Sequence, residues 1–143
     1  KDLFFSGEFG CNFCHTEITF TAAAFFNNGL DAEYSDQGRG AVTGNPADNG
    51  KFKTPSLRNI GLTAPYMHDA RFKTLEEVVE HYNSGVQAHP NLDDRMSVDG
   101  ETGGPPKQLN MTEEEKAALI AFLFTLTDEV LITDEKFSDP FNH

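Results

Sequence analysis

The sequence is short of several residue types, and each shortage excludes a class of protein. It has no tryptophan and only two cysteines, which are too few for a disulfide framework but leave a single bridge open. No run of about 18 apolar residues occurs, so a membrane span is not expected. Basic residues number 11 against 23 acidic ones, and the net charge of -12 disfavours nucleic acid and anionic membrane surfaces as partners.

The size and composition suit one domain that is short of core-forming residues. The chain has 143 residues, the length of a single ordinary domain, but only 38% of them are hydrophobic. Thirteen phenylalanines stand out against this lean background. A large buried apolar cofactor would give these rings a surface to pack on, whereas a Phe-rich core without a cofactor is the alternative interpretation.

Two capping boxes, in which Thr is followed three residues later by Glu, predict the starts of two helices. Thr74 and Glu77 predict a helix that runs to about Asn83 and stops at Gly85. Its apolar face carries Leu75, Val78, Val79 and Tyr82, spaced as one side of a helix requires. A second box starts a helix at Thr112, whose apolar stripe comprises Leu119, Phe122, Leu123 and Leu126.

The remaining chain is expected to be a short helix and two long loops. Residues 2–9 read as an amphipathic helix. Turn-forming residues such as Asn27-Asn28-Gly29 crowd the segment from Phe26 to about Pro55, and a second long loop covers Val86–Asn110. Loops of this length in a small domain are usually functional, and wrapping a cofactor is one such function. Strand signals are weak, so we expect a mainly α domain.

The two cysteines form a Cys-x-x-Cys-His motif, which predicts one covalently attached c-type haem. Cys11 and Cys14 lie one helical turn apart, a spacing at which two thiols can add to the two vinyl groups of one haem edge. His15 then lies under the iron as an axial ligand. A zinc site would need two further ligands with other spacing, and a thioredoxin-like pair would need a βαβ context.

A six-coordinate haem needs a second axial donor, and the pattern of residues alone leaves this donor open. Met and His are the usual choices in soluble electron carriers. Met111 precedes a helix, where a hydrophobic residue normally packs into the core. Met96 lies in the second long loop, a plausible setting for a ligand. The full set of candidates is Met67, Met96, Met111, His68, His81, His89 and Tyr82.

Two further motifs make the chain resemble a known family. Residues 52–60 read FKTPSLRNI and residues 62–69 read LTAPYMHD, between the cysteine motif and the first capping box. In this order and spacing, the motifs resemble the C-terminal haem domain of bacterial di-haem cytochrome c peroxidases, from Leu3 to about Asp128. The resemblance implies a cytochrome-c-like fold over residues 1–143, with long loops around one haem.

The resemblance also implies a function and a location. The family reduces hydrogen peroxide in the periplasm, and this domain accepts electrons from a small cytochrome or cupredoxin and passes them to an N-terminal haem domain. We therefore expect an electron-transferring half of a di-haem protein, in a periplasmic or otherwise extracytoplasmic location. No signal peptide precedes the motif at Lys1, so a mature or cut product is expected. A stand-alone monohaem electron carrier without catalysis is the alternative.

Residue roles follow from the same resemblance. In typical peroxidases a Met on the helix after the first capping box ligates the iron, and counting without a gap lands on Tyr82. A Tyr at this place is similar to the di-haem enzyme that matures the quinone cofactor of methylamine dehydrogenase. Tyr82 is therefore the expected ligand and Met96 its alternative. The resemblance places Phe52, Pro55, Leu57 and Tyr66 around the haem and Arg58 on a propionate.

A calcium site is a further feature of the family. The carbonyls of Thr63 and Pro65 match part of it. Another ligand would come from a domain outside this chain, so the resemblance leaves calcium doubtful here.

Overall fold

Helices provide most of the regular structure, as the sequence predicts. The computed structural model describes residues 1–139 and 141. Its α-helices are α1 (Asp2–Phe5), α2 (Cys11–Cys14), α3 (Arg39–Thr43), α4 (Leu75–Glu80), α5 (Glu113–Phe124) and α6 (Glu129–Thr133). Two short strands, β1 (Phe25–Phe26) and β2 (Phe52–Lys53), pair antiparallel, with Phe26 opposite Phe52. Single turns of other helix types are η1 (Pro46–Asp48), η2 (Ile60–Leu62), η3 (His81–Gly85), η4 (Asp94–Met96) and η5 (Glu135–Phe137).

Both capping boxes form as the sequence predicts. The Thr74 hydroxyl accepts the Glu77 amide at 3.3 Å, while the Glu77 carboxylate accepts the Thr74 amide at 3.1 Å. The same reciprocal pair joins Thr112 and Glu115 at 3.2 and 2.8 Å. Each box satisfies two amides that a helix start would otherwise leave unpaired, which fixes where α4 and α5 begin.

The helix after Thr74 changes type before it ends. Regular α4 stops at Glu80, and the chain continues as a π turn, η3, through Gly85. The predicted extent is therefore confirmed, but the last turn is wider than an α-helix. A π turn adds a residue per turn, and such turns are frequent at functional sites. Tyr82 lies within this turn.

The core forms where α1, α4 and α5 meet. Its buried residues include Leu75 and Val79 of α4 and Leu119 and Leu123 of α5, so both predicted apolar faces are confirmed. Phe4, 2% exposed, packs its ring 5.2 Å from that of Phe122. Met111 is buried in the same core, as expected for a residue before a helix. Burying each such side chain contributes about 1.5–3 kcal/mol.

The predicted helix over residues 2–9 is wrong in length. Helix α1 ends at Phe5, because the Ser6 hydroxyl donates to the Leu3 carbonyl at 2.8 Å and then accepts the Phe9 amide at 3.4 Å. A hydroxyl that bonds to the local backbone competes with the helix. Gly10 then takes a left-handed φ of 67° between α1 and α2.

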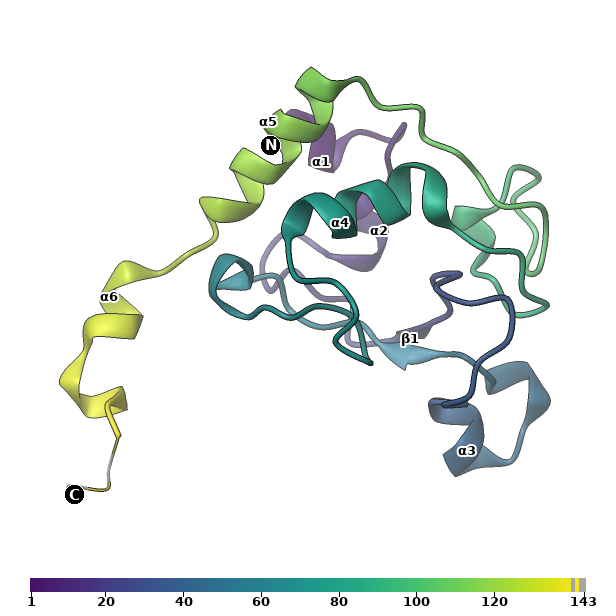
Figure 1. Cartoon of the computed structure of the whole chain (residues 1–143), viewed down its shortest axis with the longest axis horizontal. Coiled ribbons are helices and arrows are strands. Elements are labelled where there is room, and N and C mark those ends of the chain that lie inside the picture. Colours follow the sequence, from purple (N-terminus) through teal and green to yellow (C-terminus); the bar gives the residue numbers. More distant parts are fainter. Residues whose placement is uncertain (140, 142–143) are drawn as a thin grey trace.

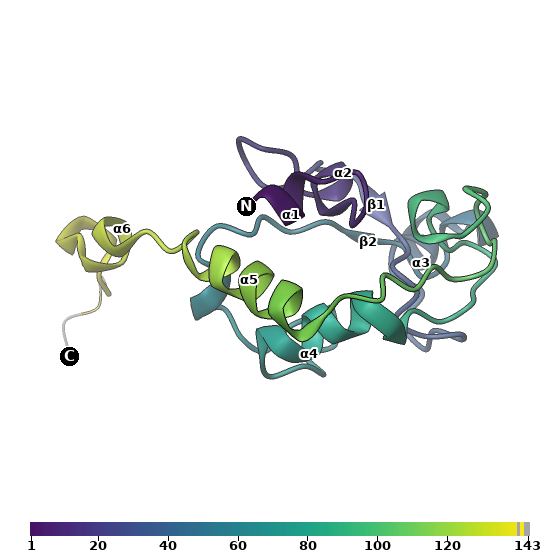
Figure 2. The same cartoon turned by 90° about the horizontal axis from the view of Figure 1, so that it is seen from above.

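The arrangement in space puts the cysteine motif and the π turn on different layers. Helices α1 and α2 lie along one side of the molecule and α4 along the opposite side, with α5 beside α4 (Figure 2). Helix α6 extends away from this body towards the C-terminus (Figure 1). Within residues 1–139 and 141, no helix has the length and apolar character needed to cross a membrane.

Candidate functional site

The cysteine motif forms a single helical turn, α2, with one cysteine at each end. Cys11 and Cys14 are the first and last residues of α2, and the His15 amide bonds to the Cys11 carbonyl at 3.0 Å. Both thiols are free in the part of the chain that the structure describes. Gly10 allows the turn, because a Cβ on it would lie 3.0 Å from the Phe13 ring and its φ is positive. The two sulfurs therefore leave the same short helix, one turn apart.

The imidazole of His15 is oriented by backbone carbonyls. Its Nδ1 lies 2.9 Å from the Phe20 carbonyl oxygen, so Nδ1 carries the proton and Nε2 is the nitrogen available to a metal. Burial lowers the pKa of His15, while the Phe20 and Pro55 carbonyls oppose this shift. A neutral imidazole with one nitrogen fixed by a carbonyl is the form in which His ligates metals.

The thiols differ in their surroundings. Burial raises the pKa of Cys11 to about 11. Burial also raises the pKa of Cys14, but the positive charge of Arg95 opposes the rise. Both groups are therefore protonated thiols at neutral pH.

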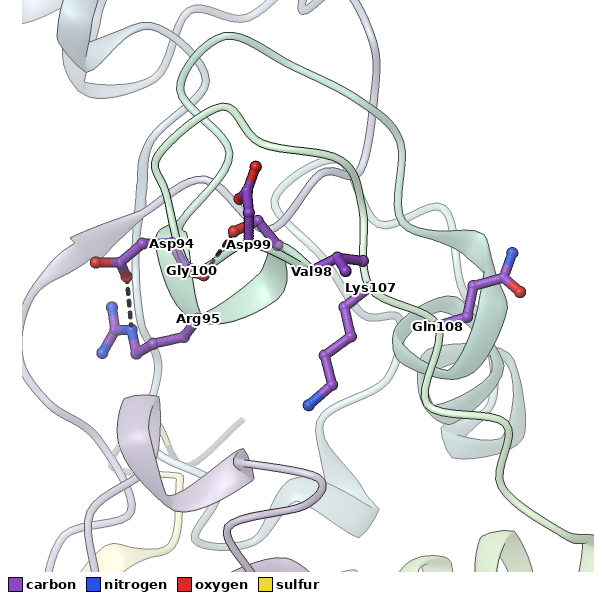
Figure 3. Close-up of a pocket in the computed structure, with 8 residues that line it drawn as sticks. Asp94, Arg95, Val98, Asp99, Gly100, Lys107 and Gln108 are labelled. Atoms are coloured by element: carbon purple, nitrogen blue, oxygen red, sulfur yellow. Dashed lines mark hydrogen bonds and ion pairs between the residues drawn. The ribbon is translucent and has the colours of Figure 1, made fainter.

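Arg95 is a site residue that sequence reasoning missed. It comes from η4 in the second long loop and donates to the Phe13 carbonyl of the motif at 3.3 Å. Asp93 holds it through two bonds of 2.6 and 2.7 Å, and its guanidinium lies 4.2 Å from the Phe26 ring centre. Figure 3 shows Arg95 at a surface pocket, facing Asp94 at 3.6 Å. The second long loop thus contacts the cysteine motif through the guanidinium of Arg95.

Tyr82 approaches the motif from the opposite layer. Burial raises the pKa of its phenol to about 12, and the hydrogen bond from Asn28 opposes the rise. The Asn28 side-chain amide donates to the Tyr82 oxygen at 3.3 Å and lies 3.6 Å from the Met67 sulfur. The structure therefore brings two candidate donors, a phenol and a thioether, to the same amide.

The three histidine candidates are engaged elsewhere. His81 is 5% exposed, and its Nε2 lies 3.1 Å from the Asn28 carbonyl. His89 accepts the Asn91 amide on Nδ1 at 3.0 Å. His68 stacks on Phe52, with ring centres 3.7 Å apart. Met96, the alternative from the sequence, is half-buried in η4, and its carbonyl accepts the Lys107 amide at 2.8 Å.

The residues that the resemblance placed around the haem have varied surroundings. Leu57 packs half-buried against the core, and Pro55 is exposed with its carbonyl near His15. Tyr66 is buried and donates to the Ile60 carbonyl at 3.0 Å, while Phe52 pairs in β2. Arg58 is exposed and donates to the Ile18 carbonyl at 2.6 Å.

The carbonyl-bearing residues of the expected calcium site, Thr63 and Pro65, both lie exposed. Among the described residues, no group of three or more His, Cys, Asp or Glu side chains is placed to hold a metal ion. The residues described therefore add no support for calcium, which the resemblance already leaves doubtful.

The residues present fit a c-type haem. Two thiols on one turn, an imidazole with Nε2 available and a phenol or thioether beside Asn28 are the groups that would hold such a haem. The Asn12 side-chain oxygen, between the cysteines, is buried without a hydrogen-bond partner among the residues described. Buried polar atoms without partners are rare in complete native structures.

Comparisons with curated proteins agree with this chemistry, although no family model matches the chain. It is 39% identical to the methylamine utilization protein MauG of Methylorubrum extorquens, over 87% of this chain and 33% of the relative. It is 33% identical to a cytochrome-c peroxidase of Denitromonas iodatirespirans, over 92% of this chain and 40% of the relative. The chain therefore spans about a third to two fifths of these relatives.

A solved structure extends the similarity to the fold. The crystal structure of a MauG-like protein associated with microbial copper homeostasis matches 99% of this chain and 49% of its own, with a TM-score of 0.80 at 38% identity. At 38% identity, the two proteins are similar in sequence as well as in fold. The chain is therefore a homologue of MauG and the cytochrome c peroxidases and belongs to their family over most of its own length.

Proposed function

We propose that the chain is an electron-transfer domain that carries one covalent c-type haem. The observation that carries this proposal is the orientation of His15, whose Nδ1 is bonded to the Phe20 carbonyl beside two free thiols. Each thiol adds its S–H across a vinyl C=C bond. A C–S bond forms and the hydrogen goes to the other vinyl carbon, so no oxidant is consumed. Cys11 and Cys14 are protonated for this addition.

In this proposal His15 and Tyr82 are the residues that would hold the haem iron. His15 would bind through Nε2, because Nδ1 is held by the carbonyl. Tyr82 would bind through its phenol oxygen as a phenolate, which a cation stabilises, with its proton released to water. The bound group supplies a reversible one-electron change of the iron. With both residues on the iron, no position would be open to peroxide, and the domain would transfer electrons rather than activate peroxide.

The setting of the domain is proposed from the relatives. The relative from Denitromonas iodatirespirans is named a peroxidase and is longer than this chain, which supports a role as the electron-accepting half of a di-haem peroxidase. An N-terminal haem domain of the same protein would receive the electrons. A small cytochrome or cupredoxin would deliver them, and a basic docking patch on it would suit the net charge of -12. Haem attachment outside the cytoplasm implies the periplasm.

The haem-loaded chain, purified after expression with a cytochrome c maturation system, tests this function. Redox titration followed by visible absorbance should show one reversible one-electron transition. Hydrogen peroxide turnover with a reduced donor should stay near the rate of a protein-free control. Rapid, repeated peroxide turnover by the chain alone would contradict an electron-transfer role.

A further inference from the structure

One side-chain amide contacts two of the candidate donors for the sixth position, the Tyr82 phenol and the Met67 thioether. The Nδ2 of Asn28 lies 3.3 Å from the Tyr82 oxygen and 3.6 Å from the Met67 sulfur. A side-chain amide nitrogen carries two hydrogens, so one group can donate to both atoms at once. Asn28 is therefore placed between two of the candidate donors for the sixth position, Tyr82 and Met67.

The backbone of Asn28 is fixed from both sides. Its carbonyl oxygen lies 3.1 Å from Nε2 of His81, the residue before Tyr82 in η3. The neighbouring Asn27 is 0% exposed and accepts the Gly29 amide at 2.8 Å. Gly29 has a φ of 63°, and a Cβ there would come within 2.6 Å of Val86. The backbone that carries the Asn28 amide is thus fixed beside the π turn that carries the phenol.

The segment that carries Met67 is tied to the same region. Arg71 forms two bonds to the carboxylate of Asp31, at 2.8 and 2.6 Å, and one to Asp69 at 2.7 Å. Paired bonds between a guanidinium and a carboxylate are the strong kind of ionic contact and restrict orientation. The Met67 sulfur is therefore held near Asn28 even though Tyr82 is the proposed ligand.

The two contacts of Asn28 both affect which of the two donors, Tyr82 or Met67, binds iron more strongly. A hydrogen bond from an amide to a phenol oxygen favours its anionic form, which is the form that binds ferric iron. An N–H directed at the thioether engages sulfur electrons that iron would otherwise share. Resting on the haem site proposed above, we propose that Asn28 is a positioning residue that selects Tyr82 rather than Met67 as the sixth ligand.

Spectra and redox titrations of the haem-loaded protein test this selection. Asn28→Leu and Asn28→Ala both remove the N–H donors without adding a charge, and two variants guard against one failing to fold. Each should move the ferric–ferrous equilibrium at least tenfold towards ferrous iron, which is about 59 mV for one electron. Each should also gain the far-red sulfur-to-iron absorbance. Asn28→Gln, which keeps an amide, should retain more of the parent behaviour.

A second substitution assigns the new ligand. Met67→Leu in the Asn28→Leu background should abolish the sulfur absorbance, whereas Met67→Leu alone should leave the parent spectrum unchanged. Parent-like spectra and potentials in both Asn28→Leu and Asn28→Ala would overturn the proposal. A parent that shows the sulfur band would overturn it too, while covalent haem and reversible reduction would still support the electron-transfer function.

Discussion

Asn83 connects the π turn to the start of α5, and its truncation should destabilise the protein more than its size suggests. The residue is 8% exposed. Its side-chain oxygen accepts the Met111 amide at 2.8 Å, and its side-chain nitrogen donates to Glu80 at 3.0 Å. Asn83→Ala removes both bonds and leaves the amide of buried Met111 without its partner. An unsatisfied buried donor costs about 1–3 kcal/mol and a lost hydrogen bond about 1 kcal/mol, so the total is about 2–4 kcal/mol.

Urea unfolding of the haem-loaded protein measures this cost. The midpoint should fall without a change in the slope of the free energy of unfolding against denaturant, because the same surface becomes exposed. Ser84→Ala is the matched control, since Ser84 donates to the same Glu80 oxygen at 2.6 Å but is exposed. It should cost less than about 1 kcal/mol. Asn83→Ala variants within about 0.5 kcal/mol of this control would refute the argument from the unpaired Met111 amide.

Three other predictions concern the axial ligand, pH and the cofactor. Tyr82→Phe should open the sixth position or recruit another ligand and raise the reduction potential; an unchanged ferric spectrum would exclude Tyr82 as ligand. Glu80→Gln should destabilise the protein at neutral pH by less than about 1 kcal/mol, because the carboxylate is half-exposed in its pair with Lys116. Its hydrogen bonds lower the pKa of Glu80 from 4.5 to about 2, so the difference from the parent should be full above pH 4.5 and vanish as pH falls towards 2 in acid unfolding curves. The double variant Cys11→Ala, Cys14→Ala should be largely unfolded by circular dichroism, because haem bound only by the native state adds to stability; parent-like cooperative melting would argue otherwise.

The sequence predicts the helices whose signals are local. The capping boxes at Thr74 and Thr112 depend on side chains three residues apart, and both form. The apolar stripes of α4 and α5 are periodic and therefore readable. The N-terminal helix was predicted too long, because the Ser6 hydroxyl bonds to the backbone and ends α1 early.

The contacts that complete the candidate site join residues far apart in the sequence, and no local sequence pattern predicts them. Asn28 reads as an ordinary turn former beside Gly29, yet it touches Tyr82 across 54 positions of sequence. Arg95 reaches the cysteine motif across 82 positions. The π turn that carries Tyr82 follows a pattern typical of an α-helix, so spacing alone predicts the face of Tyr82 but not the wider turn. Tertiary packing decides these features.

Intact mass measured under denaturing conditions tests the central claim most directly. The purified red protein should carry the mass of one haem on the chain, and peptide mapping should place it on the segment that contains Cys11 and Cys14. The colour should remain with the protein in acid acetone, and Cys14→Ala should weaken the attachment to one thioether. An unmodified chain mass, with the chromophore extracted into the organic phase, would contradict covalent haem at this site.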